Sequence, residues 1–586
     1  MNVRNTFRLL AVIFALIPLV QLTACGHGSG GGGDDSPPVS WPISSQVFTT
    51  AEQQVLPIAI AAGTPQIDPQ AVSLYAQYGY SAWQTGPGLG YVTRLDFAPG
   101  SSATNAARLL TFFTMTDVHI VDKESPAQPI YLGLKGGWGS NESSAYSPIM
   151  LSTPQVLDAA VQTINVLHQR LPFDFGISLG DDINNTQYNE LRWFIDVMDG
   201  RVITPSSGAN LGANTIDYQI PFQAAGLNKA ISWYQVIGNH DQFWSGAAYE
   251  DTKTMNAHVG STILDMAYIP NSPSDALNGT GFYMGVLLGS TPYGDIFGAG
   301  PEASFPTPPM VVADANRRSL STSTNTSLNW MREFFTTTSN PVGHGFTQSN
   351  LNDTTTTDAC YSFVPKATVP IKVIVLDDTC KGPGQANYAT GCLDTARLTW
   401  LENELQAGQD AKQLMIVAAH VPVNPIADPN NAVYAGPFFI TPGTVVNDAQ
   451  LLAILHAYPN LLMWIAGHRH VNVVTPQPSP DPVNHPELAF WQVETSSLRD
   501  FPQEFRTFDI RRNTDKTISI IVTDVDPAVA PGSPAAKSRG YAIGAARIYG
   551  TIPLTDTGSH AYNAELVKQL STQMQGIIAG YGTPLQ

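Results

Sequence analysis

Gly238-Asn239-His240-Asp241 directly follows an apolar run at residues 231–237, whose composition is typical of a buried strand. The glycine turns the chain, and each of the next three side chains can bind a metal ion or move a proton. In open α/β sheets, ligands bind at the carboxyl ends of the strands. The tetrapeptide therefore indicates a functional site at the end of this strand.

Four more segments place polar residues at the carboxyl end of an apolar strand. They are residues 109–115 before Asp117 and His119, 173–179 before Asp181, 414–419 before His420, and 461–466 before His468 and His470. One Asn or Asp at a strand end usually only caps a turn, and one His is usually structural. The five motifs together, D-x-H, G-D, G-N-H-D, H and G-H-x-H in chain order, predict one shared site.

This set of motifs resembles the calcineurin-like metallophosphoesterase superfamily, and the residues around it resemble a bacterial lipoprotein branch of that superfamily. The resemblance covers roughly residues 109–524. It implies an α/β fold, namely a four-layer α/β/β/α sandwich of two mixed sheets with long insertions. The alternation of predicted strands and helices agrees independently with the α/β class.

The resemblance also implies two metal ions that share one carboxylate. The first ion would take Asp117, His119, Asp181 and His470, and the second would take Asp181, Asn239, His420 and His468. Nitrogen and oxygen ligands suit Fe, Mn or Zn, so the identity of the metal stays open. His240 would bind no metal and would protonate the leaving oxygen, with Asp241 holding its ring in orientation.

The implied function is hydrolysis of a phosphoester, in which a hydroxide that bridges the two metals attacks phosphorus. Whether monoesters or diesters are cleaved stays open. One alternative is a metal-dependent hydrolase of a nucleotide anhydride or a phospholipid. Another is a non-catalytic lipoprotein that retains the fold. The complete ligand set argues against the second alternative, because a site freed from catalysis has no reason to keep His240.

Residues 1–24 are predicted to be a lipoprotein signal peptide. Arg4 and Arg8 precede an apolar run at residues 9–20, which is shorter than the ~20 residues of a membrane span. The sequence Leu-Thr-Ala before Cys25 resembles the bacterial lipobox, which would make Cys25 the lipidated N-terminus. We expect residues 25–40 to be a flexible tether and the protein to be exported and anchored to the cell envelope, at the outer membrane in a Gram-negative source. An ordinary signal peptide is the alternative.

Composition predicts a sizeable core, since 43% of the 586 residues are hydrophobic. We expect one domain over residues 41–586, with a core at about 109–524, an insertion at about 242–360 that shapes substrate access, and a peripheral segment at about 525–586. An amphipathic helix is predicted over residues 563–578. The net charge of −18 argues against a nucleic-acid-binding surface. The oligomeric state stays open.

Helices are predicted over residues 153–168, 188–198, 328–335, 394–406 and 449–457. Thr153 would cap the first of these helices and Gly408 would end the fourth. Cys380 and Cys392 close the shortest loop and are the preferred disulfide pair, with three unpaired thiols, including Cys360, as the alternative.

Several other polar residues near the motifs are not predicted to bind metal. Asp377 and Asp378 end a strand and are expected to be structural. Arg469 is predicted to be a solvated surface residue, and Asn184 either supports the site or caps a loop.

Overall fold

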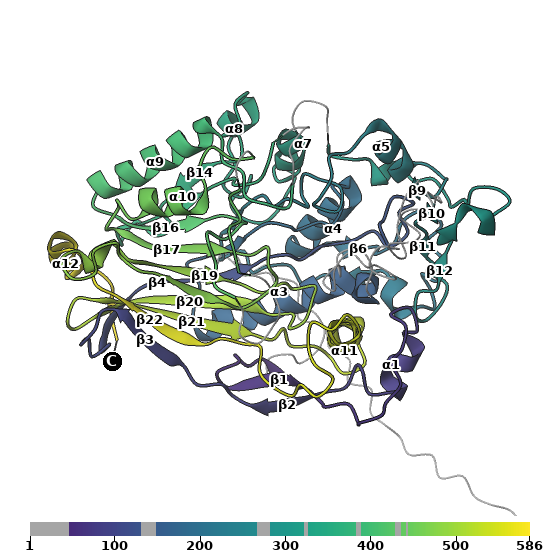
Figure 1. Ribbon diagram of the computed structural model, residues 1–586, viewed down its shortest axis with the longest axis horizontal. Coiled ribbons are helices and arrows are strands. Elements are labelled where there is room, and N and C mark those ends of the chain that lie inside the picture. The colour runs from purple at the N-terminus through teal and green to yellow at the C-terminus, as the bar shows by residue number, and fades with distance from the viewer. Residues whose placement is uncertain are drawn as a thin grey trace, which may run out of the picture. The chain divides into compact units, whose positions relative to one another are not determined.

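The computed structural model describes residues 46–130, 148–266, 282–321, 326–381, 388–427, 435–440 and 443–585 (Figure 1). The predicted signal peptide, Cys25 and the tether lie outside these residues. All described elements belong to one compact unit, Ser36–Gln586. None of the helices in the described part of the chain combines the length and the hydrophobicity that a membrane crossing needs.

An eight-stranded mixed sheet carries the first three motifs. Its main path is β3 (Val92–Phe97), β22 (Ala564–Lys568), β21 (Ile518–Val525), β20 (Phe505–Asn513), β4 (Asn105–Met115), β5 (Phe175–Ser178) and β8 (Trp233–Gln235), and β23 (Thr583–Pro584) pairs with β4. Strands β4, β5 and β8 are parallel neighbours. Their carboxyl ends therefore deliver Asp117, Asp181 and Asn239 to one edge of the sheet.

A six-stranded mixed sheet carries the other two motifs. Its order is β14 (Tyr361–Phe363), β15 (Ile371–Val375), β16 (Leu414–Ala418), β17 (Leu461–Ala466), β19 (Phe490–Glu494) and β18 (Val474–Gln477). The four strands β15, β16, β17 and β19 are parallel. Every residue of these four strands is buried, as expected for parallel strands covered on both faces. Strands β16 and β17 end next to His420 and His468.

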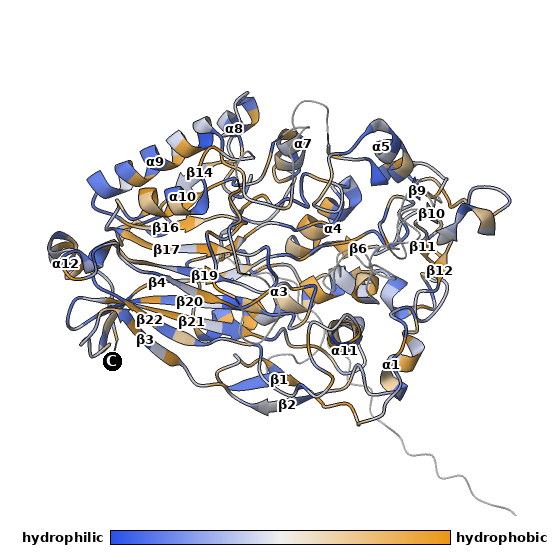
Figure 2. Cartoon of the chain, in the orientation of Figure 1, coloured by the Kyte–Doolittle hydropathy of each residue, from blue (hydrophilic) through white to orange (hydrophobic). Residues whose placement is uncertain are grey.

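Alternate residues of β15 enter two different hydrophobic clusters. Val373 and Val375 belong to the large core that also holds Phe112 of the other sheet. Ile374 packs in a second cluster with side chains of α9 (Thr395–Asp410) and α10 (Asp448–Leu455), which lie beside this sheet in Figure 1. The apolar strands and helix faces are visible in Figure 2. The predicted α/β class with mixed sheets is confirmed.

Helices α3 (Thr153–Arg170) and α4 (Tyr188–Met198) contribute their apolar faces to the large core. The bounds of α4 match the prediction, and the helix is followed by Gly200 in a left-handed conformation. The N-cap of α3 is Ser152, one residue before the predicted Thr153. Pro154 still lies in the first turn, where its missing N–H leaves no bond unmade.

The predicted insertion contains several short elements. They are α5 (Thr252–Val259), β9 (Asp265–Met266), β10 (Phe282–Tyr283), β11 (Val286–Leu287), β12 (Ile296–Phe297), β13 (Gly300–Pro301), α7 (Thr326–Glu333) and α8 (Gln348–Asn352). The remaining peripheral elements are β1 (Gln53–Pro57), α1 (Ser73–Gln77), β2 (Trp83–Pro87), β6 (Val202–Ile203), β7 (Phe222–Gln223) and α11 (Pro534–Ile548).

The predicted helix over residues 563–578 is wrong. This stretch forms strand β22, which pairs with β21 and β3 inside the eight-stranded sheet, and then helix α12 (Thr572–Ile578). The Ser571 hydroxyl caps α12 by accepting the backbone N–H of Met574. The helical periodicity at the end of the segment thus extends only back to this cap.

Gly408 does not end helix α9, which continues to Asp410. A Cβ atom at Gly408 would lie 2.4 Å from Sδ of Met415. Gly408 therefore allows the helix to pack closely against strand β16. The prediction that it ends the helix is wrong. The predicted disulfide between Cys380 and Cys392 is confirmed, and Cys360 is buried and free.

The strand that leads to Asp181 depends on a glycine at its centre. A Cβ atom at Gly176 would lie 2.1 Å from Cζ of the buried Phe113 ring on β4. We expect Gly176→Ala to lower the free energy of unfolding by about 1–3 kcal/mol, because the closely packed interior must rearrange. Denaturant titration measures this change.

Gly576→Ala is the matched control for this substitution. Gly576 lies in α12, is exposed and has open space around its Cα atom. Alanine there should raise the stability by about 0.5–1 kcal/mol through helix propensity. Equal effects of the two substitutions would contradict the packing argument.

Candidate metal centre

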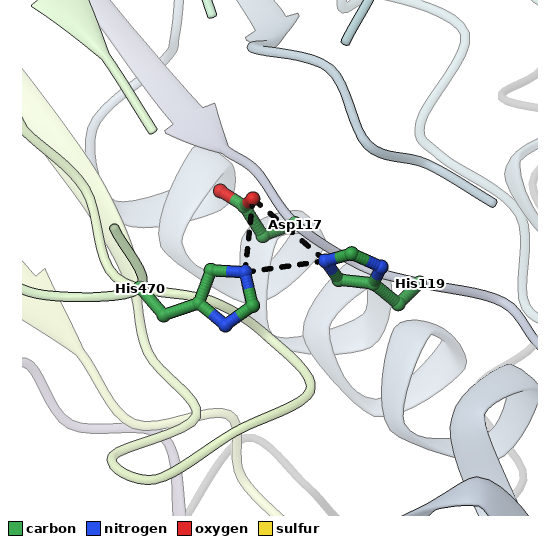
Figure 3. A group of neighbouring side chains, drawn as sticks. All are labelled: Asp117, His119 and His470. Atoms are coloured by element: carbon green, nitrogen blue, oxygen red, sulfur yellow. Dashed lines mark hydrogen bonds and ion pairs between the residues drawn. The ribbon is translucent and has the colours of Figure 1, made fainter. Parts of the chain in front are cut away.

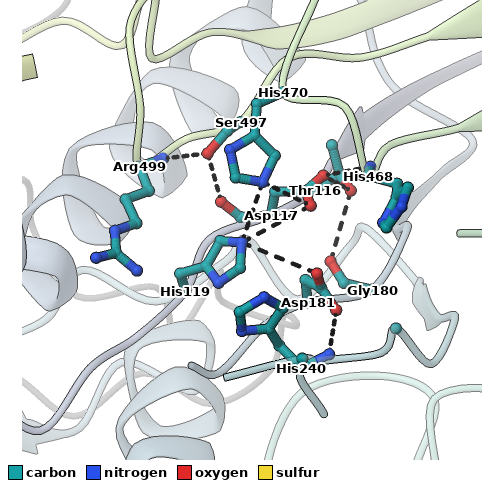
Figure 4. A network of polar contacts seen from close by, with 12 residues as sticks. Thr116, Asp117, His119, Gly180, Asp181, His240, His468, His470, Ser497 and Arg499 are labelled. Atoms are coloured by element: carbon teal, nitrogen blue, oxygen red, sulfur yellow. Dashed lines mark hydrogen bonds and ion pairs between the residues drawn. The ribbon is translucent and has the colours of Figure 1, made fainter. Parts of the chain in front are cut away.

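The predicted ligands converge from both sheets. Three groups of side chains have ligand atoms that all lie within 4.8 Å of one another: Asp117, His119 and His470; His119, Asp181 and His240; and Asp181, His420 and His468. Figure 3 shows the first group, and Figure 4 shows the first two groups, which share His119. Residues from five separate motifs, up to 353 positions apart in the chain, thus share one cluster, in which only His468 and His470 are partly exposed.

The first group surrounds Oδ1 of Asp117. This atom lies 3.1 Å from Nε2 of His470 and 3.8 Å from Nε2 of His119. It is buried and accepts no hydrogen bond. The two imidazole Nε2 atoms are 3.2 Å apart. A carboxylate oxygen and two nitrogens that face one common point fit a cation.

The third group is arranged around Nε2 of His420, with Asn239 beside it. This nitrogen lies 3.1 Å from Oδ2 of Asp181, 3.0 Å from Oδ1 of Asn239 and 3.2 Å from Nδ1 of His468. The amide nitrogen of Asn239 donates to the carbonyl of Gly246, which leaves the amide oxygen directed at His420. These four donor atoms offer the mixed nitrogen and oxygen set that a transition metal accepts.

Asp181 belongs to two of the three groups, the one with His119 and His240 and the one with His420 and His468. Its Oδ2 atom, 3.1 Å from His420, is also 3.9 Å from Nε2 of His119. Its Oδ1 atom accepts the backbone N–H of His240 at 2.8 Å, which fixes the carboxylate plane. One carboxylate therefore faces both sets of histidines.

In three of the histidines, the ring nitrogen that faces away from the cluster has a partner of its own, which fixes the orientation of the ring. Nδ1 of His420 donates to the carbonyl of Leu179 at 2.9 Å, and Nε2 of His468 donates to the carbonyl of Ala389 at 2.9 Å. Nδ1 of His470 lies 2.5 Å from Oδ2 of Asp500. Such partners fix the tautomer and leave the other nitrogen free for a ligand bond.

The backbone is left-handed at five of the predicted ligands: Asp117, His119, Asp181, His468 and His470. Non-glycine residues seldom adopt positive φ, and such strain gathers at functional sites. Hydrogen bonds between motifs hold it in place. Asp117 N donates to the carbonyl of Gly180, His119 N to the carbonyl of Asp181, and His468 N to Oδ2 of Asp117.

The expected contact between Asp241 and the ring of His240 is wrong. Nδ1 of His240 lies 2.9 Å from the carbonyl oxygen of Asn184, which leaves Nε2 toward the cluster. The Asp241 carboxylate instead accepts the backbone N–H groups of Gly238, Asp181 and Asp182, at 2.8, 3.0 and 3.1 Å. Asp241 therefore ties two motif turns together and does not touch the ring.

Asn184 supports the site, which is one of its two predicted roles. Its side-chain oxygen accepts Nη1 of Arg499 at 2.7 Å, while its carbonyl holds His240. The backbone N–H of Arg499 donates to the hydroxyl of Ser497, and that hydroxyl donates to the carbonyl of Asp117 (Figure 4). The turn after β19, which is not one of the five motifs, thus stabilises the site through hydrogen bonds.

Arg469 is buried, so the prediction of a solvated surface residue is wrong. The residue is 6% exposed, and its Nε lies 2.5 Å from Oε2 of the buried Glu494. Asp377 and Asp378 have structural contacts, as expected. Asp378 accepts the backbone N–H groups of His420 and Val421, and Asp377 pairs with Lys381.

The charges of the cluster shift its pKa values in opposite directions. Burial opposes ionisation of Asp117 and Asp181, but neighbouring histidines outweigh it and lower the pKa of both carboxyl groups. Burial also disfavours the charged form of His420 and His470, but Asp181 and Asp117 respectively raise the pKa of these two rings to about 10. The metal-free cluster thus holds protons on two of its histidines at neutral pH.

The other rings behave differently. Burial lowers the pKa of His240 to about 3, although Asp181 acts against it. Burial and the charge on His420 lower the pKa of His468 to about 4. His240 is therefore neutral at pH 7, with its proton on Nδ1 and a lone pair on Nε2.

Metal uptake should release protons from His420 and His470. Their raised pKa values mean that both rings are charged at pH 7 and lose this charge only as the pH rises through about 10. A metal ligand must be neutral imidazole. We expect the release of about two protons per chain at pH 7 and tighter apparent metal binding up to pH 10. Calorimetry in buffers of different ionisation enthalpy measures the released protons, and metal binding without proton release would contradict this charge assignment.

Comparison with known proteins gives likenesses only among solved structures. No protein-family model matches the sequence, and no curated protein is significantly similar to it. Among solved structures, the chain is similar to a dimetal phosphatase from Danio rerio, with a TM-score of 0.33 and 12% sequence identity over 72% of this chain and 97% of that chain. A likeness at this level carries no functional argument, so function has to be inferred from the site.

Proposed function

We propose that the chain is a hydrolase of phosphoesters that depends on two metal ions. The observation that carries this proposal is the position of Asp181, whose carboxylate faces His420 on one side and His119 on the other. A shared carboxylate between two sets of nitrogen and oxygen donors is what two adjacent cations require.

We infer that the donor atoms would divide between two ions in the way that the motifs suggest. Asp117, His119, Asp181 and His470 would hold the first ion, and Asp181, Asn239, His420 and His468 would hold the second. Two bound cations would neutralise the charge of a phosphoester and lower the pKa of the water that attacks it. Nitrogen and oxygen donors admit Fe, Mn and Zn alike.

His240 would move a proton at Nε2. The ring is held by the carbonyl of Asn184, and its Nε2 atom is on the side of the cluster. Because burial keeps the ring neutral, Nε2 must first accept a proton before it can pass one to the leaving oxygen. Entry of an anionic substrate favours that protonation, since a nearby negative charge raises the pKa of an imidazole.

We also propose that the two large sheets are the inner layers of a four-layer α/β/β/α sandwich. Two observations support this order. Phe112 of one sheet and Val373 of the other share the large core, while Ile374 on the opposite face of β15 packs against α9 and α10. Helices α3 and α4 supply the second helical layer in this proposal.

The variants Asp181→Asn and His240→Ala separate metal binding from proton transfer. Asp181→Asn should lose metal and activity together, because it removes the shared charge. His240→Ala should keep two ions per chain and lose turnover by about 10²–10⁴-fold on an alkyl phosphoester. The loss should be smaller on an aryl phosphoester whose leaving group departs as an anion. Elemental analysis and kcat on both substrates, with Mn or Fe/Zn, provide the data.

Asp481→Asn and His485→Ala are matched controls. Both residues lie in one turn after β18, where the carboxylate of Asp481 accepts hydrogen bonds from Asn484 and the ring of His485 contacts Glu487. They should retain full metal content and activity. Loss of metal in His240→Ala would make His240 a ligand. If the parent protein bound two ions but cleaved no phosphomonoester, diester, nucleotide anhydride or phospholipid, the interpretation as a binding lipoprotein would replace the hydrolase.

We further propose that a lipid on Cys25 anchors the protein to the cell envelope, with the catalytic domain exported. The lipobox-like residues before Cys25 support this proposal. We expect Cys25→Ala to shift the protein from the membrane fraction to the aqueous fraction of the expressing cells. A variant that remained as membrane-bound as the parent would contradict lipidation. No nucleic-acid partner is proposed, given the net charge of −18.

A further inference from the structure

The second metal ligand set includes one histidine that is held from outside by a loop. Nε2 of His468 donates to the carbonyl oxygen of Ala389 at 2.9 Å, so Nδ1 is the nitrogen that lies 3.2 Å from Nε2 of His420. The choice of Nδ1 distinguishes His468 from His420, whose ligand atom is Nε2. If the Ala389 carbonyl moved away, His468 would lose the partner that fixes both its tautomer and its ring plane.

The residues on both sides of Ala389 are held by contacts with other segments of the chain. Cys392 forms a disulfide with Cys380, which directly follows strand β15 and the turn at residues 376–379. The backbone N–H of Cys392 donates to the carbonyl of Asp378 at 2.8 Å. Tyr388, on the other side of Ala389, packs its ring against Phe243 with the ring centroids 4.5 Å apart. Residues 388–392 are thereby fixed at both ends.

The same segment also contacts the chain after β16. Gly391 N donates to the carbonyl of Phe438 at 3.0 Å, and the ring of Phe438 meets His468 edge-on at a centroid distance of 5.4 Å. The disulfide sulfurs lie in one apolar cluster with Phe243 and Tyr388. Phe243 comes two residues after Asp241, so the disulfide cluster joins His468 to the turn that carries Asn239.

The first ligand set receives its support elsewhere. His470 is oriented by Asp500, and Asp117 by the hydroxyl of Thr116 and the backbone of His468. The contact of the segment 388–392 with a ligand histidine is the one to His468 of the second set. We expect a loss of order in this segment to act on the second set first.

We propose that the Cys380–Cys392 disulfide is a positioning element for the second metal ion, because it holds the Ala389 carbonyl that directs Nδ1 of His468 into the site. This inference rests on the proposed two-metal function. Both sulfurs are buried, with Cys380 at 0% and Cys392 at 2% exposure, so the bond is a lasting part of the folded protein. It is also a device that suits an oxidising compartment, where such bonds persist.

The test compares metal binding in the parent chain and in Cys380→Ala/Cys392→Ala. Mn²⁺ is added stepwise to chelator-treated protein, and electron paramagnetic resonance separates isolated from exchange-coupled ions. The parent should reach two Mn²⁺ per chain with a coupled signal. The double variant should bind one ion as tightly as the parent does and the other about 10–100-fold more weakly, which is the usual effect of losing an outer partner of a ligand. At one to two equivalents its spectrum should be that of an isolated ion.

Cys360→Ala is the matched control, because it removes a buried cysteine that forms no disulfide. It should keep two ions and the coupled signal. Gly391→Ala is a second probe that leaves both cysteines in place. Its Cβ atom would lie 2.6 Å from the Phe439 ring, so the segment must shift, and we expect the same selective loss of one ion. This variant replaces the double variant if the latter does not fold.

The outcomes separate this inference from the function on which it rests. Two ions with parent affinity in both probes would overturn the positioning role and leave the proposed function intact. Equal weakening of both ions would also overturn it, because the disulfide would then stabilise the fold in general. A parent chain that binds fewer than two ions would contradict the proposed function itself.

Discussion

The structure depends on keeping two carboxylates, Asp117 and Asp181, ionised in the protein interior. Burying an ion costs several kcal/mol unless opposite charge and hydrogen bonds compensate for it. Here the compensation comes from His470 and His420 and from backbone N–H groups that reach the carboxylates across motifs. To present these groups, the chain turns left-handed at five ligand positions. Without a cation, protons on the rings of His420 and His470 offset the charges of Asp181 and Asp117.

This constraint also explains how the two sheets are joined at the site. The eight-stranded sheet supplies Asp117, Asp181 and Asn239, and the six-stranded sheet supplies the histidines of the last two motifs. The backbone of His468 donates to Asp117, and Nδ1 of His420 donates to the carbonyl of Leu179. Glycines permit the close approach, since a Cβ at Gly180 would lie 2.6 Å from the backbone nitrogen of Gly238. The cluster is therefore part of the packing between the sheets as well as a site.

Sequence alone predicted the strands that end in motif residues, because a buried apolar run followed by a polar turn is a local signal. It could not predict Asp500, Asn184 or Ala389 as partners of the histidines. These contacts join residues 30 or more positions apart, and two of the three use main-chain carbonyls, which every residue possesses. Arg469 was misplaced for a related reason: its burial depends on Glu494, a partner that local pattern does not reveal. Strand β22 was predicted as part of a helix, because the apolar spacing of the helix that follows it begins earlier in the sequence than the helix itself.

The two ligand sets differ in charge before any metal binds. The first contains Asp117 and Asp181, and Asp500 stands directly behind His470. The second contains only Asp181 as an anion, because Asn239 is neutral. The rings of His420 and His468 both donate a hydrogen bond to a main-chain carbonyl. A carboxylate behind an imidazole makes the ring a stronger donor than a carbonyl does. The first set therefore stabilises positive charge more strongly, and the second depends more on geometry. For that reason an uncharged element that positions a ring, such as the disulfide-bound segment, matters most at the second set.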